Sequence, residues 1–495
     1  MTIKPLIRPF FALAAAASIL WSFYYLPPDS LPASSVLFAF GIFAAGMLPF
    51  AYRFLMGNES SGAPIVELSA VFYAVCFAGP VLLLTFAWPP GMPDCHIGNI
   101  CYYAMKFSNY EAIANPQVLA LIFAGVSIFL VTFFLTRKWA ATTLPCYSLG
   151  RAYPLKNTKI LLYILLISGL AFDLYPQLKK LPSISQLAAP VVYIAIGGFM
   201  MLWKQKALTG LESALVFFGA IPAIIILKAV SGLLSQMIFI FIFIYVFCAV
   251  LRIKHAFLSL TIAGVVLISL YWPFRIYRSV VWNNPSISSE AGFSLKHKIR
   301  IMGKAIIAVY RGETEFSVQG IVKKIDRTNR ARLYIRRFML LPMFAKVYVQ
   351  TPDPIAYLGG KTYLPLLTSF VPRVLWPAKP REAFGNTFGN IYGFVSDDDK
   401  ETSINVPWII ELFINFGWKG VLAGMGAIGF LLSCLDRFFN SRESPPLASI
   451  VGISIIGKLA VPESNFSLMW GSIIPLAIFF YIFFRAGLAV PLERE

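Results

Sequence analysis

Charged residues are scarce in this sequence. Only 13% of its 495 residues are Asp, Glu, Lys or Arg, whereas a soluble domain carries roughly 25%. Hydrophobic residues make up 58% of the chain, and mean hydropathy is +0.72. Apolar runs long enough to cross a bilayer as helices recur along the whole length, without the short alternating segments of a β-barrel. The sequence therefore predicts an all-α, polytopic integral membrane protein.

Acidic residues are the scarcer of the two charge signs. The chain has 23 Asp and Glu against 42 Lys and Arg, which gives a net charge of +19. Such a basic balance often indicates a nucleic-acid partner. In a membrane protein it is better explained by basic loops that orient the spans and face anionic lipid. We therefore expect a lipid bilayer, and no nucleic acid, as a partner.

Cysteine is also rare, and its spacing excludes common metal sites. None of the six cysteines has the Cys/His spacing of a metal site. Cys95 and Cys101 share one expected outer loop, where they either form a short disulfide or remain two unrelated thiols. The other four are expected to be packing residues: Cys76, Cys146, Cys248 and Cys434.

The apolar runs predict about twelve transmembrane helices. No small-residue cleavage site clearly follows the first run, so we expect a retained helix and not a signal peptide. The segment from Pro407 to Leu435 is too long for a simple span and is expected to turn at Gly417 or Gly420. The expected spans lie near residues 8–25, 35–54, 64–87, 116–136, 158–175, 184–203, 210–229, 231–251, 256–274, 406–435, 446–461 and 466–485.

Basic residues predict the orientation of these spans. With the N-terminus in the cytoplasm, fifteen Lys and Arg fall at cytoplasmic ends and four in short outer loops, as the positive-inside rule requires. Both termini are then cytoplasmic. The predicted regions are helices 1–9 in residues 1–274, a long outer segment in 275–406, and helices 10–12 in 407–495.

The long outer segment begins with two basic stretches. Arg275 and Arg278 are expected just beyond the ninth span, and a basic run from 295 to 304 has the spacing of an amphipathic helix. A second run, from Lys323 to Arg337, also has a helical pattern. Adhesion to anionic lipid explains both runs. The alternative is a site for a phosphate-bearing lipid substrate, whose oxygens arginine forks would bind.

A proline-rich stretch follows, with the sequence VPRVLWPAKP at residues 371–380. Its three prolines exclude a regular helix and favour an extended path. Arg373 and Lys379 would then be held near the interface, where Trp376 prefers to lie. Cations on a stiff loop suit the stabilisation of a negative leaving group; the alternative is an interfacial anchor.

Small polar residues dominate the next stretch. Residues 385–390, GNTFGN, are expected to form turns whose amides and asparagines, Asn386 among them, contact sugar hydroxyls. The acidic run Asp397–Asp399 has a D-x-D spacing that binds metal in some soluble glycosyltransferases. Here it is better explained as a solvated turn beside Lys400.

The tenth span carries an acidic residue near its beginning. Asn405 and Pro407 precede it, and Glu411 lies one turn inside. A carboxylate at that depth costs free energy unless it has a partner or a role, and partial burial would raise its pKa toward that of a general base. A structural ion pair with a nearby arginine is the alternative. His297 is the second candidate for a base.

The stretch from 364 to 420 resembles the oligosaccharide repeat unit polymerases, the Wzy-type O-antigen polymerase family. The resemblance rests on P-R-x-x-W-P-x-K-P at Pro372–Pro380, on Gly385-Asn386, on Asn405-x-Pro407 with Glu411, and on Asn415-Phe416-Gly417-x-x-Gly420. It covers roughly fifty residues. It implies a GT-C-like membrane enzyme at the outer leaflet of a bacterial inner membrane.

The resemblance also implies a reaction and its residues. The enzyme would join undecaprenyl-pyrophosphate-linked oligosaccharide units, without metal or cofactor, and work with a flippase and a chain-length regulator. Glu411 would be the catalytic base, with His297 second. The substrate-binding residues would be Arg275, Arg278, Arg373, Lys379, Asn386 and Asn405.

Two other functions remain open at this point. An O-antigen ligase would share the architecture and the donor chemistry, although the PR-x-x-WP-x-KP run favours the polymerase. A flippase or transporter is the alternative from a different class. Charges expected within the membrane would suit it: Glu67, Glu212, Lys228 and Lys458.

Overall fold

The structure is a computed structural model. It describes residues 33–55, 62–86, 115–149, 154–175, 177–178, 184–231, 234–253, 256–282, 295–313, 315–318, 321–324, 340–369, 371, 376, 378–379, 384–400, 402–441 and 443–489. The described chain divides into two compact units. Unit 1 comprises Met1–Tyr147, Arg332–Glu443 and Ile456–Pro475, and unit 2 comprises Ser148–Ala331, Ser444–Ile455 and Leu476–Glu495.

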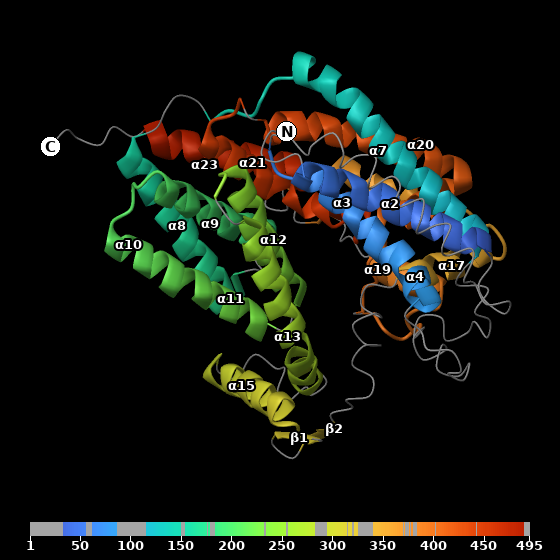
Figure 1. The fold of residues 1–495 in the computed structure, drawn as a ribbon, viewed down its shortest axis with the longest axis horizontal. Coiled ribbons are helices and arrows are strands. Elements are labelled where there is room, and N and C mark those ends of the chain that lie inside the picture. Colours follow the sequence, from blue (N-terminus) through green and yellow to red (C-terminus); the bar gives the residue numbers. More distant parts are fainter. Residues whose placement is uncertain are drawn as a thin grey trace, which may run out of the picture. The chain divides into compact units, whose positions relative to one another are not determined.

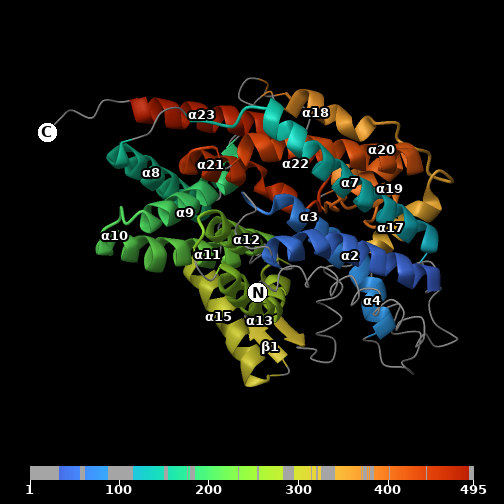
Figure 2. The same ribbon diagram turned by 45° about the horizontal axis from the view of Figure 1, so that its top comes forward.

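Unit 1 is built around α20, a 32-residue helix from Trp408 to Phe439. The long helix α7, Pro116–Thr143, packs along it, as both views show (Figures 1 and 2). Its other elements are α2 (Ala33–Leu55), α3 (Ile65–Tyr73), η2 (Ala74–Ala78), α4 (Gly79–Phe86), α17 (Leu341–Gln350), η7 (Lys361–Tyr363), α18 (Leu364–Ser369), α19 (Phe384–Ile391), η8 (Gly457–Ala460) and α22 (Phe466–Trp470).

Glycines bring α7 and α20 into close contact. A Cβ on Gly429 of α20 would lie 2.3 Å from the carbonyl oxygen of Phe129 on α7. On the other helix, a Cβ on Gly125 would lie 3.0 Å from Val421. Small residues at such contacts allow helix backbones to approach within a membrane, where apolar burial alone does not drive association. The pair therefore forms a tightly packed scaffold for the residues at the beginning of α20.

Unit 2 is a second group of apolar helices with one small hairpin. Gly198 lets α9 approach Leu162 of α8, since an added Cβ would lie 2.3 Å from its side chain. The elements of this unit are α8 (Leu155–Leu174), η5 (Ile184–Gln186), α9 (Ala188–Lys204), α10 (Gly210–Ala214), η6 (Leu215–Ala220), α11 (Ile221–Val230), α12 (Leu234–Val250), α13 (Ala256–Trp282), α15 (Leu295–Arg311), β1 (Glu315–Val318), β2 (Ile321–Lys324), α21 (Pro446–Ile456) and most of α23 (Ile473–Ala489).

The structure confirms a mainly helical, multi-pass membrane protein. Eight helices among the described residues are long and apolar enough to cross a membrane, and two shorter apolar helices cover Gln236–Val250 and Pro446–Ala460. Eleven of the expected spans coincide with helices to within several residues. The first expected span, 8–25, lies outside the described residues. A total of twelve transmembrane helices remains a prediction.

One expectation for the long outer segment is wrong. Helix α13 continues to Trp282, so Arg275 and Arg278 lie on its C-terminal turns, and their place just beyond the ninth span stays a prediction. Lys323 and Lys324 form part of β2, which pairs antiparallel with β1 in the register Val318↔Ile321, although a helix was expected from Lys323. The β-branched Ile321-Val322 and the glycine before them favour a tight hairpin over a helix. The rest of that basic run lies outside the described residues.

Candidate functional site

Glu411 lies in the first turn of α20. Pro407 is the N-cap residue, with φ −57° and ψ 149°, and thus begins the helix as the sequence predicted. The Glu411 side chain is fully buried, at 0% exposure. Its Oε2 accepts a hydrogen bond of 2.6 Å from the backbone N–H of Phe466. A buried carboxylate is thus held by a backbone amide at the beginning of α22.

Helix α20 is interrupted six residues later, at Gly417. This residue has φ 62° and ψ −150°, a backbone conformation that only glycine adopts without strain, and the expected break at this position is confirmed. The segment before η7 caps the carbonyls that the break leaves without helical donors. The N–H of Leu358 donates to Ile414 O at 2.9 Å, and the N–H of Gly359 to Asn415 O at 3.2 Å.

Asn415 connects this capping segment to the turn that holds Glu411. Its Oδ1 accepts from the N–H of Gly360 at 2.8 Å. Its Nδ2 donates to Thr362 Oγ1 at 2.9 Å and to the backbone oxygen of Glu411 at 2.8 Å. Because Asn415 is 1% exposed, these bonds form away from solvent. They fix the position of η7 against the first half of α20.

Aromatic rings pack around Phe466, whose backbone N–H donates to Glu411. Phe466 stacks on Trp470, with ring centroids 4.7 Å apart. Trp408 lies 5.9 Å from Trp470 and 6.2 Å from Phe466. Tyr363 meets Phe466 edge to face at 6.0 Å. We call Tyr363, Trp408, Phe466 and Trp470 the aromatic group.

Three buried donors of the aromatic group have no hydrogen-bond partner among the described residues. They are Tyr363 Oη, Trp408 Nε1 and Trp470 Nε1. Burial, and then the nearby carboxyl of Glu411, raise the pKa of Tyr363 well above its usual value, so its hydroxyl stays protonated. A buried donor without a partner costs free energy and calls for an explanation such as a bound water or ligand. The three donors could bind the hydroxyls of a polar ligand.

The predicted cations are only partly described. Lys379 is half-buried, and its Nζ donates to the carbonyls of Ser369 and Val371 at 3.2 and 3.1 Å. It thus ties the two sides of the proline-rich loop together. Arg373, the other predicted cation of this loop, lies outside the described residues.

The stretch 385–390 is a helix, α19, and the expectation of turns there is wrong. Phe388 lies one turn after Phe384 and one turn before Tyr392, and its ring contacts both, which favours a helix. Gly385 faces the returning chain, where an added Cβ would lie 2.2 Å from Ser403 Oγ. The apparent turn signal of the glycines was a signal of close packing.

Asn386 and Asn405 both contribute to the structure of this region. Asn386 Nδ2 donates to the carbonyls of Asp399 and Thr402, at 2.9 and 2.8 Å, and so fastens α19 to the segment before α20. Asn405 is exposed, and its Oδ1 accepts a hydrogen bond from Ser464 Oγ at 3.2 Å. This bond links the segment before α20 to the segment before α22.

The remaining predicted site residues belong to unit 2. Arg275 and Arg278 are exposed on α13, and His297 is exposed on α15. In unit 1, Asp397 and Asp398 are exposed in a turn, as expected, and Asp399 accepts bonds from the N–H and Oγ1 of Thr402. Within the described residues, no group of three His, Cys, Asp or Glu could hold a metal ion.

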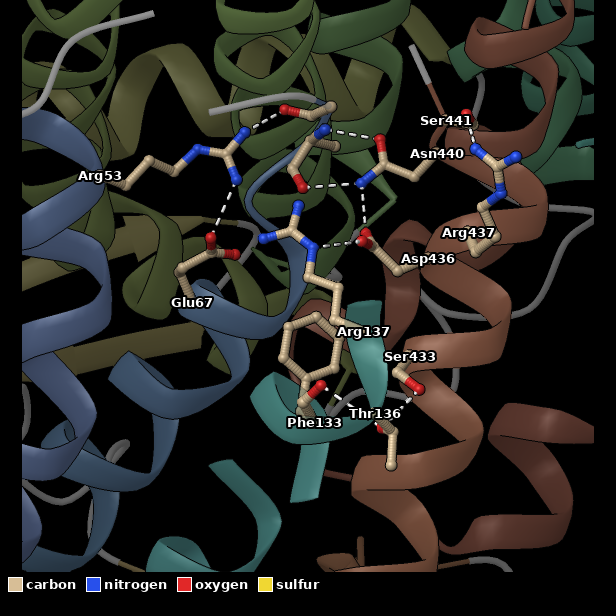
Figure 3. A network of polar contacts seen from close by, with 12 residues as sticks. Arg53, Glu67, Phe133, Thr136, Arg137, Ser433, Asp436, Arg437, Asn440 and Ser441 are labelled. Carbon is tan, nitrogen blue, oxygen red and sulfur yellow. Dashed lines mark hydrogen bonds and ion pairs between the residues drawn. The ribbon is translucent and has the colours of Figure 1, made fainter. Parts of the chain in front are cut away.

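A second polar cluster lies toward the other end of α20 (Figure 3). Arg53 of α2 binds Glu67 of α3 at 2.9 Å and also donates to the carbonyl of Gly62. Arg137 of α7 lies 3.6 Å from Asp436 of α20, which also accepts from Asn440 at 2.6 Å. The cluster joins four helices that the sequence does not place together.

The other charges expected within the membrane also have partners. Lys228 pairs with Asp173 at 2.8 Å, and Glu212 with Lys159 at 2.9 Å. Lys458 donates to Ser472 Oγ at 2.5 Å. Each of these charged side chains therefore has a polar partner within unit 1 or within unit 2.

Sequence reasoning missed half of the site. The motif around Asn415 pointed to that residue. Thr362 stands 49 residues before Glu411, and Phe466 and Trp470 stand 55 and 59 residues after it, with no spacing signal. Comparisons with protein-family models, with curated proteins and with solved structures find no match to this chain.

Proposed function

We propose that the protein is a glycosyltransferase that polymerises oligosaccharide repeat units carried on a polyprenyl pyrophosphate. One observation carries the proposal: a fully buried carboxylate, Glu411, stands among aromatic rings and buried donors that have no partner among the described residues. The multi-pass helical fold supports it, because a lipid-linked donor is reached from within the membrane. The resemblance of the 364–420 stretch to repeat unit polymerases supports it as well.

The site suits an acceptor sugar. Aromatic rings offer apolar faces to a sugar ring, and the buried donors Tyr363 Oη, Trp408 Nε1 and Trp470 Nε1 match its hydroxyls. Glu411 then takes the proton of the attacking hydroxyl. The acceptor oxygen forms a bond to the anomeric carbon of the donor, while the bond from that carbon to the pyrophosphate oxygen breaks.

The leaving pyrophosphate calls for cations. Arg373 and Lys379, on the proline-rich loop of unit 1, are the candidates. Because Lys379 Nζ already donates hydrogen bonds to two carbonyls, we assign most of the stabilisation of the leaving pyrophosphate to Arg373. Losing a group that stabilises the departing charge should cost about 2–4 kcal/mol of barrier. Lysine at position 373 should restore only part of the activity, because it lacks the bidentate fork.

Reconstitution with lipid-linked repeat units tests the proposal. The purified full chain in nanodiscs receives these units with and without a lipid A-core acceptor, and products are separated by size. Ladders of linked units without the core acceptor are the expected result. Transfer only to the core acceptor would indicate a ligase. Movement of units across a proteoliposome membrane without new linkages would indicate a transporter, and either outcome would refute the polymerase.

The proposed orientation has its own test. We propose that the protein resides in a bacterial inner membrane with β1 on the outer side and the end of α7 in the cytoplasm. Ser317 and Thr142 are both exposed, so a cysteine at either position is open to reagent. An impermeant maleimide should label Ser317→Cys, and not Thr142→Cys, in intact cells. The reverse pattern would invert the topology.

A further inference from the structure

Helix α15 is fastened to unit 2 by one face. Ile301, Met302, Ala305, Ala308 and Val309 are buried, and the helix packs against α13 and β1. At its C-terminal end, Tyr310 Oη donates to the carbonyl of Ser269 at 3.0 Å, which ties the helix to the middle of α13. The buried face therefore already has its partners within the chain.

The opposite face of α15 is exposed and has two sectors. At 100° per residue, Leu295, Ile299 and Tyr310 share one side, and their exposures are 38%, 42% and 63%. The cations occupy the neighbouring sector: Lys296, Arg300, Lys304 and Arg311, each of them exposed. Ile307 stands among these cations at 49% exposure.

Charge on this helix is of one sign only. From Leu295 to Arg311 the sequence LKHKIRIMGKAIIAVYR contains five Lys and Arg, one His and no Asp or Glu. A helix that merely faced water would carry acidic residues among the basic ones, to form pairs at i, i+4. Exposed apolar side chains beside an acid-free row of cations match the boundary between acyl chains and anionic headgroups.

We propose that the outer face of α15, comprising Leu295, Lys296, Ile299, Arg300, Lys304, Ile307, Tyr310 and Arg311, binds the anionic headgroups of the surrounding bilayer. The apolar sector enters the acyl boundary, and the cationic sector contacts lipid phosphates. A free phosphate or pyrophosphate would need the cations but not the exposed apolar sector. This surface holds whether or not the protein is a polymerase, because it requires no substrate.

Photocrosslinking in the full chain tests this surface directly. Benzoylphenylalanine replaces Ile299, and the protein is reconstituted in nanodiscs of phosphatidylcholine with 30 mol% phosphatidylglycerol. Mass spectrometry of the adducts gives the ratio of the two lipids at that position. We expect lipid adducts with phosphatidylglycerol enriched about fivefold or more over the bulk ratio, as a cation near an anionic surface provides. The same probe at Asp398, in an exposed turn of unit 1, should give few lipid adducts.

Charge variants separate anionic recognition from apolar contact. Lys296→Gln, Arg300→Gln and Lys304→Gln together should bring the phosphatidylglycerol enrichment at position 299 close to the bulk ratio. A matched variant that removes three exposed lysines elsewhere, Lys138→Gln, Lys206→Gln and Lys400→Gln, should leave it unchanged. Excess pyrophosphate should not reduce the adducts.

Three results would overturn the proposal. The first is crosslinking to protein in place of lipid. The second is a phosphatidylglycerol adduct ratio equal to the bulk ratio when Lys296, Arg300 and Lys304 are native, and the third is loss of the lipid adducts on adding pyrophosphate. The first would assign the face to a protein partner, and the last to a phosphate-bearing substrate. The enrichment in the unsubstituted background decides the question even if the triple variant fails to fold.

Discussion

Helix α20 carries an acidic residue toward each end, and the surroundings of the two residues differ. Asp436, near the C-terminal end, lies 3.6 Å from the Arg137 guanidinium and accepts from Asn440, within a cluster that also contains the Arg53–Glu67 pair (Figure 3). Glu411, in the first turn, accepts from the backbone N–H of Phe466 and stands among aromatic rings. The surroundings of Asp436 include a guanidinium with a formal positive charge, whereas those of Glu411 offer a backbone N–H and aromatic rings.

This difference distinguishes an acidic residue that holds helices together from one that can act as a general base. The Arg137 guanidinium and the Asn440 amide fix the geometry of Asp436, so the cluster ties α2, α3, α7 and α20 together. A carboxyl group set among rings can gain a proton at a smaller electrostatic cost, which a general base must do in every turnover. We therefore assign packing to the Asp436 end of the helix and acceptor chemistry to the Glu411 end.

The largest effect on stability is expected from breaking the cluster. Arg53→Ala leaves Glu67 and the Gly62 carbonyl without their donor, and removal of one partner from a buried ion pair costs about 3–5 kcal/mol. Thermal unfolding of the purified protein should show a marked loss of stability, while Lys138→Ala, at an exposed position, should show none. Replacing both partners, with Arg53→Met and Glu67→Leu, should recover most of the loss. An unchanged unfolding temperature for Arg53→Ala would show that the cluster contributes little.

The break in α20 should be the next most sensitive feature. Gly417→Ala places a Cβ 2.6 Å from Tyr357 Oη in a conformation that other residues avoid, at a cost of about 1–3 kcal/mol. Because the break positions the capping segment, specific activity should fall with stability. The control is Gly303→Ala on α15, where an added Cβ meets nothing within 4 Å and the helix should tolerate it. Equal stability of the two variants would mean that the break is not required.

Asn415→Ala should have a smaller effect. It leaves the N–H of Gly360 and the hydroxyl of Thr362 without their partner, and an unsatisfied buried group costs about 1–3 kcal/mol. Hydrogen exchange should show faster opening of residues 357–363 than in the native protein, while the Asp436 cluster keeps its protection. Uniform loss of protection across unit 1 would contradict a local role.

Trp470→Phe should have the smallest effect on stability. It keeps an aromatic ring that stacks on Phe466 and removes one donor that has no partner among the described residues. Stability should change little, but the KM for the acceptor should rise about 3–10-fold, as expected for one lost hydrogen bond. Trp203→Phe, at an exposed position of α9, serves as the control. An unchanged KM would remove Trp470 from the acceptor site.

Much of the fold could be predicted because membrane helices require long apolar runs. The same logic located the break, since Gly417 interrupts a run that is too long. Strand β2 was missed because a short basic stretch with alternating apolar residues suits either a helix or a hairpin. Helix α19 was missed because its glycines serve close packing, Gly385 against Ser403 and Gly389 against Val395, and do not form a turn.

The candidate site was only half predictable, for a related reason. Glu411 and Asn415 lie on one helix face, where a charged or amide side chain is conspicuous against apolar neighbours. Phe466 and Trp470 are ordinary aromatic residues in an apolar sequence, and only folding brings them to Glu411. The pairing of Arg53 with Glu67, and of Arg137 with Asp436, likewise follows from helix packing that periodicity does not reveal.

Specific activity of Glu411→Gln and Asp436→Asn, measured per folded molecule, tests the contrast most directly. Both changes remove a carboxylate and keep the shape of the side chain. If Glu411 is the base, Glu411→Gln should lower turnover by about 10²–10⁴-fold with little loss of folded protein. Asp436→Asn should lower the unfolding temperature while the surviving folded protein polymerises at close to the native rate. An active Glu411→Gln enzyme, or an Asp436→Asn enzyme that folds stably yet fails to polymerise, would contradict the assignment.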